Sequence, residues 1–92
     1  MITYDVVPGV DMVTHGFTNC FVVRDSVGVT LVDAAFPRTW HQVEECLRVR
    51  NRGVGDVRGL VITHGHFDHL GFAAQLQRQG VRVWAHQIGR AH

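Results

Sequence analysis

The chain has 92 residues, of which 46% are hydrophobic and 18% charged, and its formal net charge is +1. This composition fits one small globular domain or part of a larger one, and it excludes a disordered chain. All nine basic residues are arginines scattered along the sequence, so we expect neither a nucleic-acid partner nor a membrane surface.

The first residues, Met1 to Asp5, lack the basic and apolar regions of a secretion signal, and no apolar run is long enough to cross a bilayer. We therefore expect a cytoplasmic protein. Cys20 and Cys46 lack C-x-x-C spacing and fall on different predicted elements. They are expected to be reduced thiols.

The first part of the chain predicts strands. Residues 2–7 form an apolar stretch that ends at Pro8-Gly9, and residues 17–24 form a second stretch. The sequence Asp25-Ser26-Val27-Gly28 is typical of a turn, so residues 29–33 are predicted to return as the second strand of a hairpin. Residues 34–37 follow as a loop, and Pro37 is suited to the start of a helix.

Residues 38–50 predict a helix, because Trp40, Val43 and Leu47 recur at helical spacing. Gly53 is a candidate for a left-handed residue that ends this helix. The basic residues near the helix end, Arg48, Arg50 and Arg52, are predicted to be solvated.

Residues 57–63 predict a strand buried on both faces, residues 70–78 a second helix ending at Gly80, and residues 81–85 a final strand. These three elements form a β-α-β unit, which predicts a parallel, right-handed pair of strands. Trp40 and Trp84 are both predicted as core residues. The expected fold is α/β (α+β), a mixed sheet with helices on one face.

One segment points to chemistry: Thr63-His64-Gly65-His66-Phe67-Asp68-His69-Leu70 directly follows the apolar run of the strand at 57–63. Alternate residues of an extended chain point the same way, and the strand end is where ligand-binding loops lie in such sheets. Imidazole and carboxylate donors suit zinc, with iron or manganese also possible. The alternative is a polar surface loop.

A catalytic zinc site needs three protein ligands and an open position for water. The segment offers two ligands for each of two ions, so further donors must come from elsewhere. His86, after the last strand, is one candidate, or else an exposed loop residue. His15, before the strand at 17–24, is predicted either to line the mouth of the site or to lie in a surface loop.

The run from Thr63 to His69, followed by Leu70-Gly71, resembles the H-x-H-x-D-H signature of the metallo-β-lactamase-fold hydrolases, which include glyoxalase II. Residues 16–23 and 30–34 resemble early strands of that family. The resemblance implies a four-layer αββα sandwich of roughly twice this length. Residues 1–92 would then be a single partial domain, the amino-terminal half of the sandwich.

The resemblance also implies roles for particular residues. His64 and His66 would bind a first zinc ion, and Asp68 and His69 a second, with Asp68 also the expected catalytic residue. Asp33 would orient a ligand without touching the metal, or else it merely forms the turn at the end of its strand. The implied reaction is attack by a metal-bound hydroxide on an ester, thioester, lactone or amide carbonyl of a small-molecule substrate.

Two alternatives to a complete hydrolase stay open. The chain could be a truncated, catalytically silent metal-binding fragment or an assembly partner of the same fold. A small structural zinc module is disfavoured, because the sequence lacks a cysteine-rich set of four ligands. Half of a sandwich would also leave one face of its sheet bare, so we expect self-association through that uncovered face.

Overall fold

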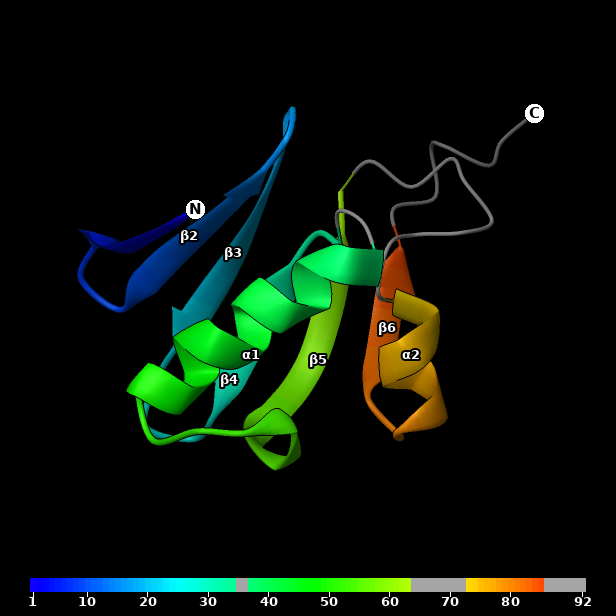
Figure 1. Ribbon diagram of the computed structural model, residues 1–92. Helices are drawn as coiled ribbons and strands as arrows, with labels where there is room; N and C mark the ends of the chain where they lie inside the picture. Colours follow the sequence, from blue (N-terminus) through cyan, green and yellow to red (C-terminus); the bar gives the residue numbers. More distant parts are fainter. Residues whose placement is uncertain (35–36, 64–72, 86–92) are drawn as a thin grey trace.

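The computed structural model describes residues 1–34, 37–63 and 73–85, which form one six-stranded sheet with strand order β1-β2-β3-β4-β5-β6 (Figure 1). The strands are β1 (Ile2–Val7), β2 (Val10–His15), β3 (Thr18–Arg24), β4 (Val29–Val32), β5 (Val57–Ile62) and β6 (Arg82–Ala85). Neighbours from β1 to β4 are antiparallel, whereas β4, β5 and β6 are parallel. The predicted mixed sheet and the parallel pair formed by its last two strands are thus confirmed.

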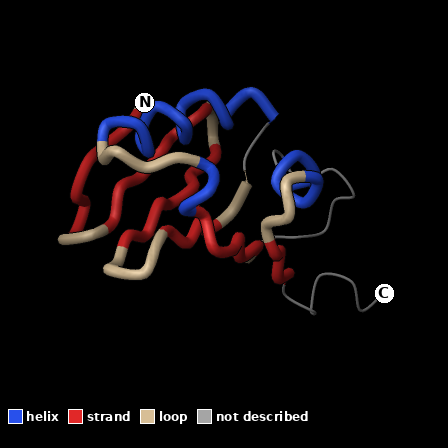
Figure 2. The backbone as a smooth tube through the Cα atoms, turned by 90° about the horizontal axis from the view of Figure 1, so that it is seen from below, coloured by secondary structure: helices blue, strands red, loops and turns tan. Residues whose placement is uncertain are grey.

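Two helices lie on the same side of this sheet (Figure 2). Helix α1 (Trp40–Val49) follows the 3-10 turn η1 (Pro37–Thr39), and α2 (Ala73–Arg78) connects β5 to β6; a second 3-10 turn, η2 (Val54–Asp56), precedes β5. The predicted apolar stripe of α1 is confirmed, because Trp40, Val43 and Leu47 are all buried against the strands.

The end of α1 differs from the prediction. Gly53 has an extended backbone with φ −142°, whereas Asn51 takes the left-handed conformation with φ 58°. The Arg52 N–H donates to the Leu47 carbonyl at 2.8 Å, which closes the last turn. Asparagine tolerates this conformation better than most residues, so it replaces glycine here. At the end of α2, Gly80 has φ 88°, as predicted.

Strand β2 was absent from the sequence prediction. Val13 is fully buried on the face that α1 covers, while Val10 and Met12 lie on the other face of the sheet. Apolar residues therefore occur on both faces, and the charged residue Asp11 stands at a helix-facing position. This mixture removes the polar–apolar alternation by which half-buried strands are recognised.

The strand register sorts the sheet residues into two rows. The helix-facing row, which packs under α1 and α2, consists of Asp11, Val22, Leu31, Leu60 and Val83. A neighbouring position in each strand points to the opposite face, and these positions give what we call the open-face row: Met12, Phe21, Val32, Val61 and Trp84. Within the described ranges no helix covers this row (Figure 2). Trp84 is 49% exposed, so its prediction as a core residue is wrong.

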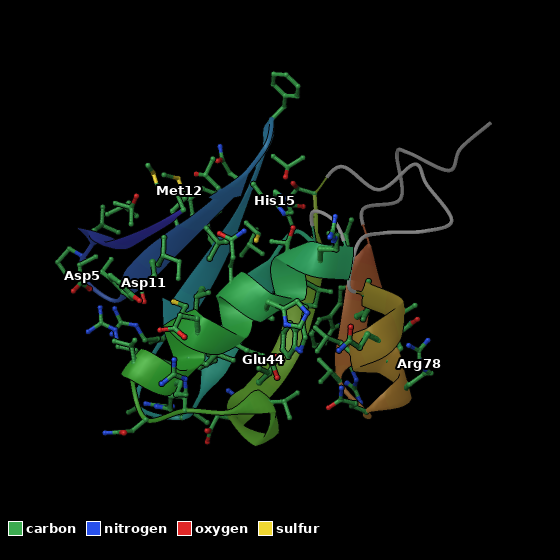
Figure 3. All side chains as sticks on the ribbon, in the orientation of Figure 1. Asp5, Asp11, Met12, His15, Glu44 and Arg78 are labelled. Carbon is green, nitrogen blue, oxygen red and sulfur yellow. The ribbon has the colours of Figure 1, made fainter. Side chains whose placement is uncertain are left out.

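A cluster of charged residues joins the first three strands to α1. The carboxylate of Asp11, fully buried, accepts hydrogen bonds from Arg24 at 3.1 Å, from Arg50 at 3.2 Å and from the Cys46 thiol at 3.2 Å. Asp5 bonds to both arginines at 2.7 and 3.1 Å and donates its N–H to Asp11 at 2.7 Å. Arg50 is therefore part of an ion cluster rather than the solvated helix end that the sequence predicted. Figure 3 shows Asp5 and Asp11 together at the end of β2 opposite His15.

This ion cluster makes stability depend on acid pH. Burial alone would raise the pKa of Asp11, but the hydrogen bonds from Asp5, Arg50, Cys46 and Arg24 lower it from 3.8 to about 2. Because the pKa is depressed in the folded chain, the stabilisation is present above the unfolded-chain pKa and is lost as the pH falls toward 2. Nearly two pKa units correspond to about 2 kcal/mol.

We therefore expect the free energy of unfolding in urea to decline between about pH 4 and pH 2, partly through Asp11. The variant Asp11→Asn has no such carboxyl, so its decline over the same range is expected to be shallower than that of the wild type. Parallel profiles for the two chains would show that Asp11 does not carry this pH dependence.

Candidate metal centre

One edge of the sheet gathers the ends of several strands. Strands β2, β4, β5 and β6 run in the same direction, so their carboxyl ends lie at this edge. The residues that end or directly follow the first three of them are His15, Asp33 and Thr63. We call this the site edge, because the predicted ligand segment begins one residue after Thr63.

Asp33 ties the end of β4 to the end of β5. Its Oδ1 accepts hydrogen bonds from the Thr63 N–H at 2.7 Å and from the Thr63 hydroxyl at 2.8 Å, and its Oδ2 lies 2.6 Å from the same hydroxyl. Its own N–H donates to the Val61 carbonyl at 2.7 Å. The last residue before His64 is thus held through its backbone and its side chain by one carboxylate.

The backbone of Asp33 is in the left-handed region, with φ 68°. This conformation is uncommon for residues other than glycine, although aspartate and asparagine adopt it more readily than most. It occurs at the point where the chain leaves the sheet and the carboxylate turns toward β5. Such a conformation persists only where surrounding contacts hold it, and the bonds to Val61 and Thr63 are contacts of that kind.

The predicted ligands His64, His66, Asp68 and His69 lie outside the described residues, as does His86. In residues 1–34, 37–63 and 73–85, no three histidine, cysteine, aspartate or glutamate side chains gather in a way that could hold a metal ion. The ligand set therefore stays a prediction, and the structure describes the strand end that leads into it.

His15 also lies at the site edge, but not as the surface-loop residue that was one of its two predicted settings. It ends β2, is half-buried, and its Nδ1 lies 2.6 Å from the hydroxyl oxygen of Thr39. Thr39, fully buried at the start of α1, was not singled out in the sequence. This bond places the start of α1 at the same edge as Asp33 and Thr63.

The sequence did contain a signal for the Asp33–Thr63 contact. Both residues follow apolar strand segments, and parallel neighbouring strands bring such positions to one edge. No comparable signal marked Asp11 or Thr39, because Cys46 and Arg50, which bond to Asp11, and His15, which lies beside Thr39, are 24 to 39 residues away in the sequence.

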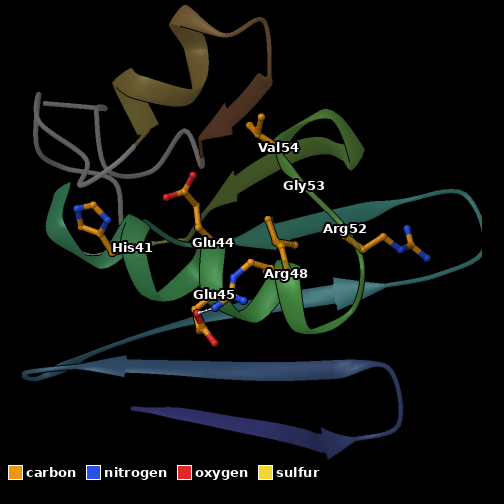
Figure 4. Close-up of a pocket in the computed structure, with 8 residues that line it drawn as sticks. His41, Glu44, Glu45, Arg48, Arg52, Gly53 and Val54 are labelled. Atoms are coloured by element: carbon orange, nitrogen blue, oxygen red, sulfur yellow. Dashed lines mark hydrogen bonds and ion pairs between the residues drawn. The ribbon is translucent and has the colours of Figure 1, made fainter.

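A pocket of about 400 Å³ lies between α1 and the segment at 52–54 (Figure 4). Among its lining residues are His41, Glu44, Glu45 and Arg48, all exposed on α1, with Glu45 paired to Arg48. Asp33 and Thr63 do not line this pocket. It is therefore separate from the predicted metal centre.

Comparison with known proteins agrees with this architecture. The sequence model of the metallo-beta-lactamase superfamily matches residues 13–91. This chain belongs to the metallo-beta-lactamase superfamily.

Solved structures show the same fold. A HARLDQ-motif mutant of the metallo-beta-lactamase from Cronobacter sakazakii is 26% identical over 87% of this chain, with a TM-score of 0.72. The subclass B3 metallo-beta-lactamase BJP-1 of Bradyrhizobium japonicum is 24% identical over 82% of this chain, with a TM-score of 0.67. The chain spans 32% and 29% of the lengths of these two proteins.

A comparison with curated proteins found no match. Among the described residues, none of the helices has the length and apolar character needed to cross a membrane.

Proposed function

We propose that this chain carries part of the metal centre of a metal-dependent hydrolase. The observation that supports this best is that the Asp33 carboxylate accepts hydrogen bonds from the N–H and the hydroxyl of Thr63. Thr63 comes directly before the H-x-H-x-D-H segment. Membership of the metallo-beta-lactamase superfamily makes hydrolysis the expected class of reaction.

The donor chemistry of the segment fits zinc, because it combines three imidazoles with one carboxylate. His64 and His66 would hold one ion and Asp68 and His69 the second, with iron or manganese as alternative metals. A bound ion would supply Lewis acidity, which makes a water molecule nucleophilic near neutral pH.

The chain's own contribution is positioning. Asp33 fixes the backbone and hydroxyl of Thr63, so the residue before His64 has little freedom to move. A ligand that is ordered before the metal binds loses less entropy on binding. Carboxylates that hydrogen-bond to a metal-binding segment raise its metal affinity by ordering it before the metal binds. Asp33 is proposed to orient the ligands in this way without touching the ion.

The proposed substrate is a small molecule with an ester, thioester, lactone or amide carbonyl, and Asp68 is the proposed catalytic residue. A second candidate function is metal binding without catalysis. The chain spans 29–32% of the length of these solved relatives, and the further metal ligands that a catalytic site needs are not found in the segment itself. This favours metal binding without catalysis.

Zinc titration of the chain tests the metal centre. We expect zinc to raise the melting temperature and a chelator to reverse the rise, because a ligand that binds only the folded state stabilises it. The variant His66→Ala is expected to weaken zinc binding at least tenfold, whereas His41→Ala, an exposed histidine on α1, is expected to leave it unchanged.

Hydrolysis of a chromogenic ester or lactone separates the two candidate functions. Zinc-dependent turnover that is lost in His66→Ala would support the hydrolase, while zinc binding without turnover would support the silent metal-binding chain. Zinc affinity in His66→Ala equal to that of the wild type would show that the metal centre is wrongly assigned.

A further inference from the structure

His15 lies at the carboxyl end of β2 (Figure 3) and is bonded there through both its backbone and its side chain. Across the β2–β3 turn, the Thr18 hydroxyl donates to the His15 carbonyl at 2.7 Å. The half-buried imidazole has its Nδ1 2.6 Å from the hydroxyl oxygen of Thr39, which lies 24 residues later in the sequence. The ring therefore has a fixed place and a partner on another element.

Thr39 uses its hydroxyl for this contact and not for its own helix. It occupies the N-cap position of α1, where a threonine side chain usually accepts a hydrogen bond from a backbone N–H of the first turn. No such capping bond is made here. Thr39 is fully buried, so its hydroxyl requires a partner within the protein, and His15 provides one. The contact joins β2 to the start of α1 and does not serve the helix itself.

The connection from β4 to α1 is bonded to other strands at both of its ends. It begins at Asp33, whose carboxylate accepts hydrogen bonds from the N–H and the hydroxyl of Thr63 on the β5 side. It ends at Thr39, which is bonded to His15 on the β2 side. The left-handed backbone of Asp33, with φ 68°, persists only where surrounding contacts hold it. The bond at Thr39 is suited to support this conformation from the far end of the connection.

We infer that His15 is a positioning residue of the metal centre, acting through Thr39 on the connection that begins at Asp33. This inference rests on the proposed function, because it concerns the ligands that Asp33 is proposed to orient. The imidazole fixes Thr39 relative to β2, so the backbone that leads back to Asp33 is held at both ends. The Asp33 carboxylate then stays aligned with Thr63, the residue before the ligands. This role requires no contact between His15 and a metal or a substrate.

The fold itself does not depend on this bond. Trp40, Val43 and Leu47 already pack α1 against the sheet. Loss of the bond between His15 and Thr39 is therefore expected to leave the chain folded and to change the alignment at the site edge.

Amide hydrogen exchange of the Thr63 N–H, followed by NMR with chelator present, tests the inference without metal. His15→Phe keeps an aromatic ring but has no nitrogen, and local opening at Thr63 is expected to make this exchange about tenfold faster. His15→Asn can place a polar atom near the position of Nδ1 and is expected to stay within about twofold of the wild type. His41→Phe makes the same change at an exposed histidine on α1 and is expected to have no effect.

Zinc titration calorimetry gives the second measurement. His15→Phe is expected to weaken zinc binding about tenfold, as for other residues that orient metal ligands, and His15→Asn to restore it. Because His15 acts through Asp33, His15→Phe is expected to cause no further loss of affinity in a chain that already carries Asp33→Asn. If His15→Phe does not fold, Thr39→Val removes the same bond from the other side and is expected to give the same two effects.

The outcomes separate this inference from the proposed function. A folded His15→Phe chain with the Thr63 exchange rate and zinc affinity of the wild type would overturn the role of His15, even if its unfolding free energy had fallen. If His66→Ala loses zinc and His15→Phe does not, the metal centre stands and the inference fails. A wild type that binds no zinc would reject the proposed function and the inference together, and faster Thr63 exchange in His15→Phe would then show only a structural bond.

Discussion

Replacement of Asp11 by alanine is expected to lower the free energy of unfolding by about 3–4 kcal/mol, the usual cost of removing one partner of a buried ion pair. The measurement is urea unfolding at pH 7 and a fixed protein concentration. Asp11 is fully buried, and its carboxylate lies among the side chains of Arg24, Arg50 and Cys46.

The size of this effect follows from what the variant leaves behind. Arg24 and Arg50 are only 18% and 27% exposed, so each would keep a charge that water solvates poorly and that is paired only with the half-exposed Asp5. The Nε of Arg24 is already a buried donor with no hydrogen-bond partner among the described residues. The Asp5 N–H would also lose its acceptor. Unpaired buried donors and charges cost more than the pair itself contributes.

The exposed pair of Glu45 and Arg48 provides the control. Glu45→Ala removes a carboxylate of the same kind from a surface pair, which contributes about 0–1 kcal/mol. A loss below about 1 kcal/mol in Asp11→Ala, similar to that in Glu45→Ala, would mean that the ion cluster does not hold β1, β2 and α1 together.

Replacement of Asp33 by asparagine is expected to weaken zinc binding by about 10–100-fold, the range found when residues that orient metal ligands are changed. Isothermal titration calorimetry with zinc measures the affinity. Asparagine keeps the shape of the side chain and tolerates a φ of 68°, so the backbone turn is preserved. What it loses is the charge and one of the two oxygens that surround the Thr63 hydroxyl.

Asp25→Asn is the matched control. Asp25 also accepts backbone N–H groups, from Val27 and Gly28, but in the β3–β4 turn at the opposite edge of the sheet. The same chemical change there is expected to leave zinc affinity unaltered. Thr63→Val, which removes the hydroxyl bonded to Asp33, is expected to weaken zinc binding in the same direction as Asp33→Asn. If Asp33→Asn binds zinc within twofold of the wild type, Asp33 does not orient the ligands.

Local patterns predicted most of the elements because their causes are local. The turn at residues 25–28 is closed by the side chain of Asp25 on the N–H groups of Val27 and Gly28. The stripe of Trp40, Val43 and Leu47 fixed the buried side of α1. The left-handed residue after the helix was placed two positions too late, because Asn51 and Gly53 can both adopt this backbone conformation and the sequence does not say which one does.

The sequence by itself determined the class of fold, the order of most strands and helices, and the kinds of donor atom that the segment at 63–70 carries, since these depend on residue type, periodicity and spacing. Only the tertiary structure decided the burial of Asp11 and the exposure of Trp84. It alone also decided the bond between His15 and Thr39 and the two hydrogen bonds by which Thr63 donates to Asp33. Each of these depends on residues from distant parts of the chain meeting, or on a sheet face that no described helix covers. Contacts of that kind follow from strand order and register, which a residue's immediate neighbours in the sequence do not specify.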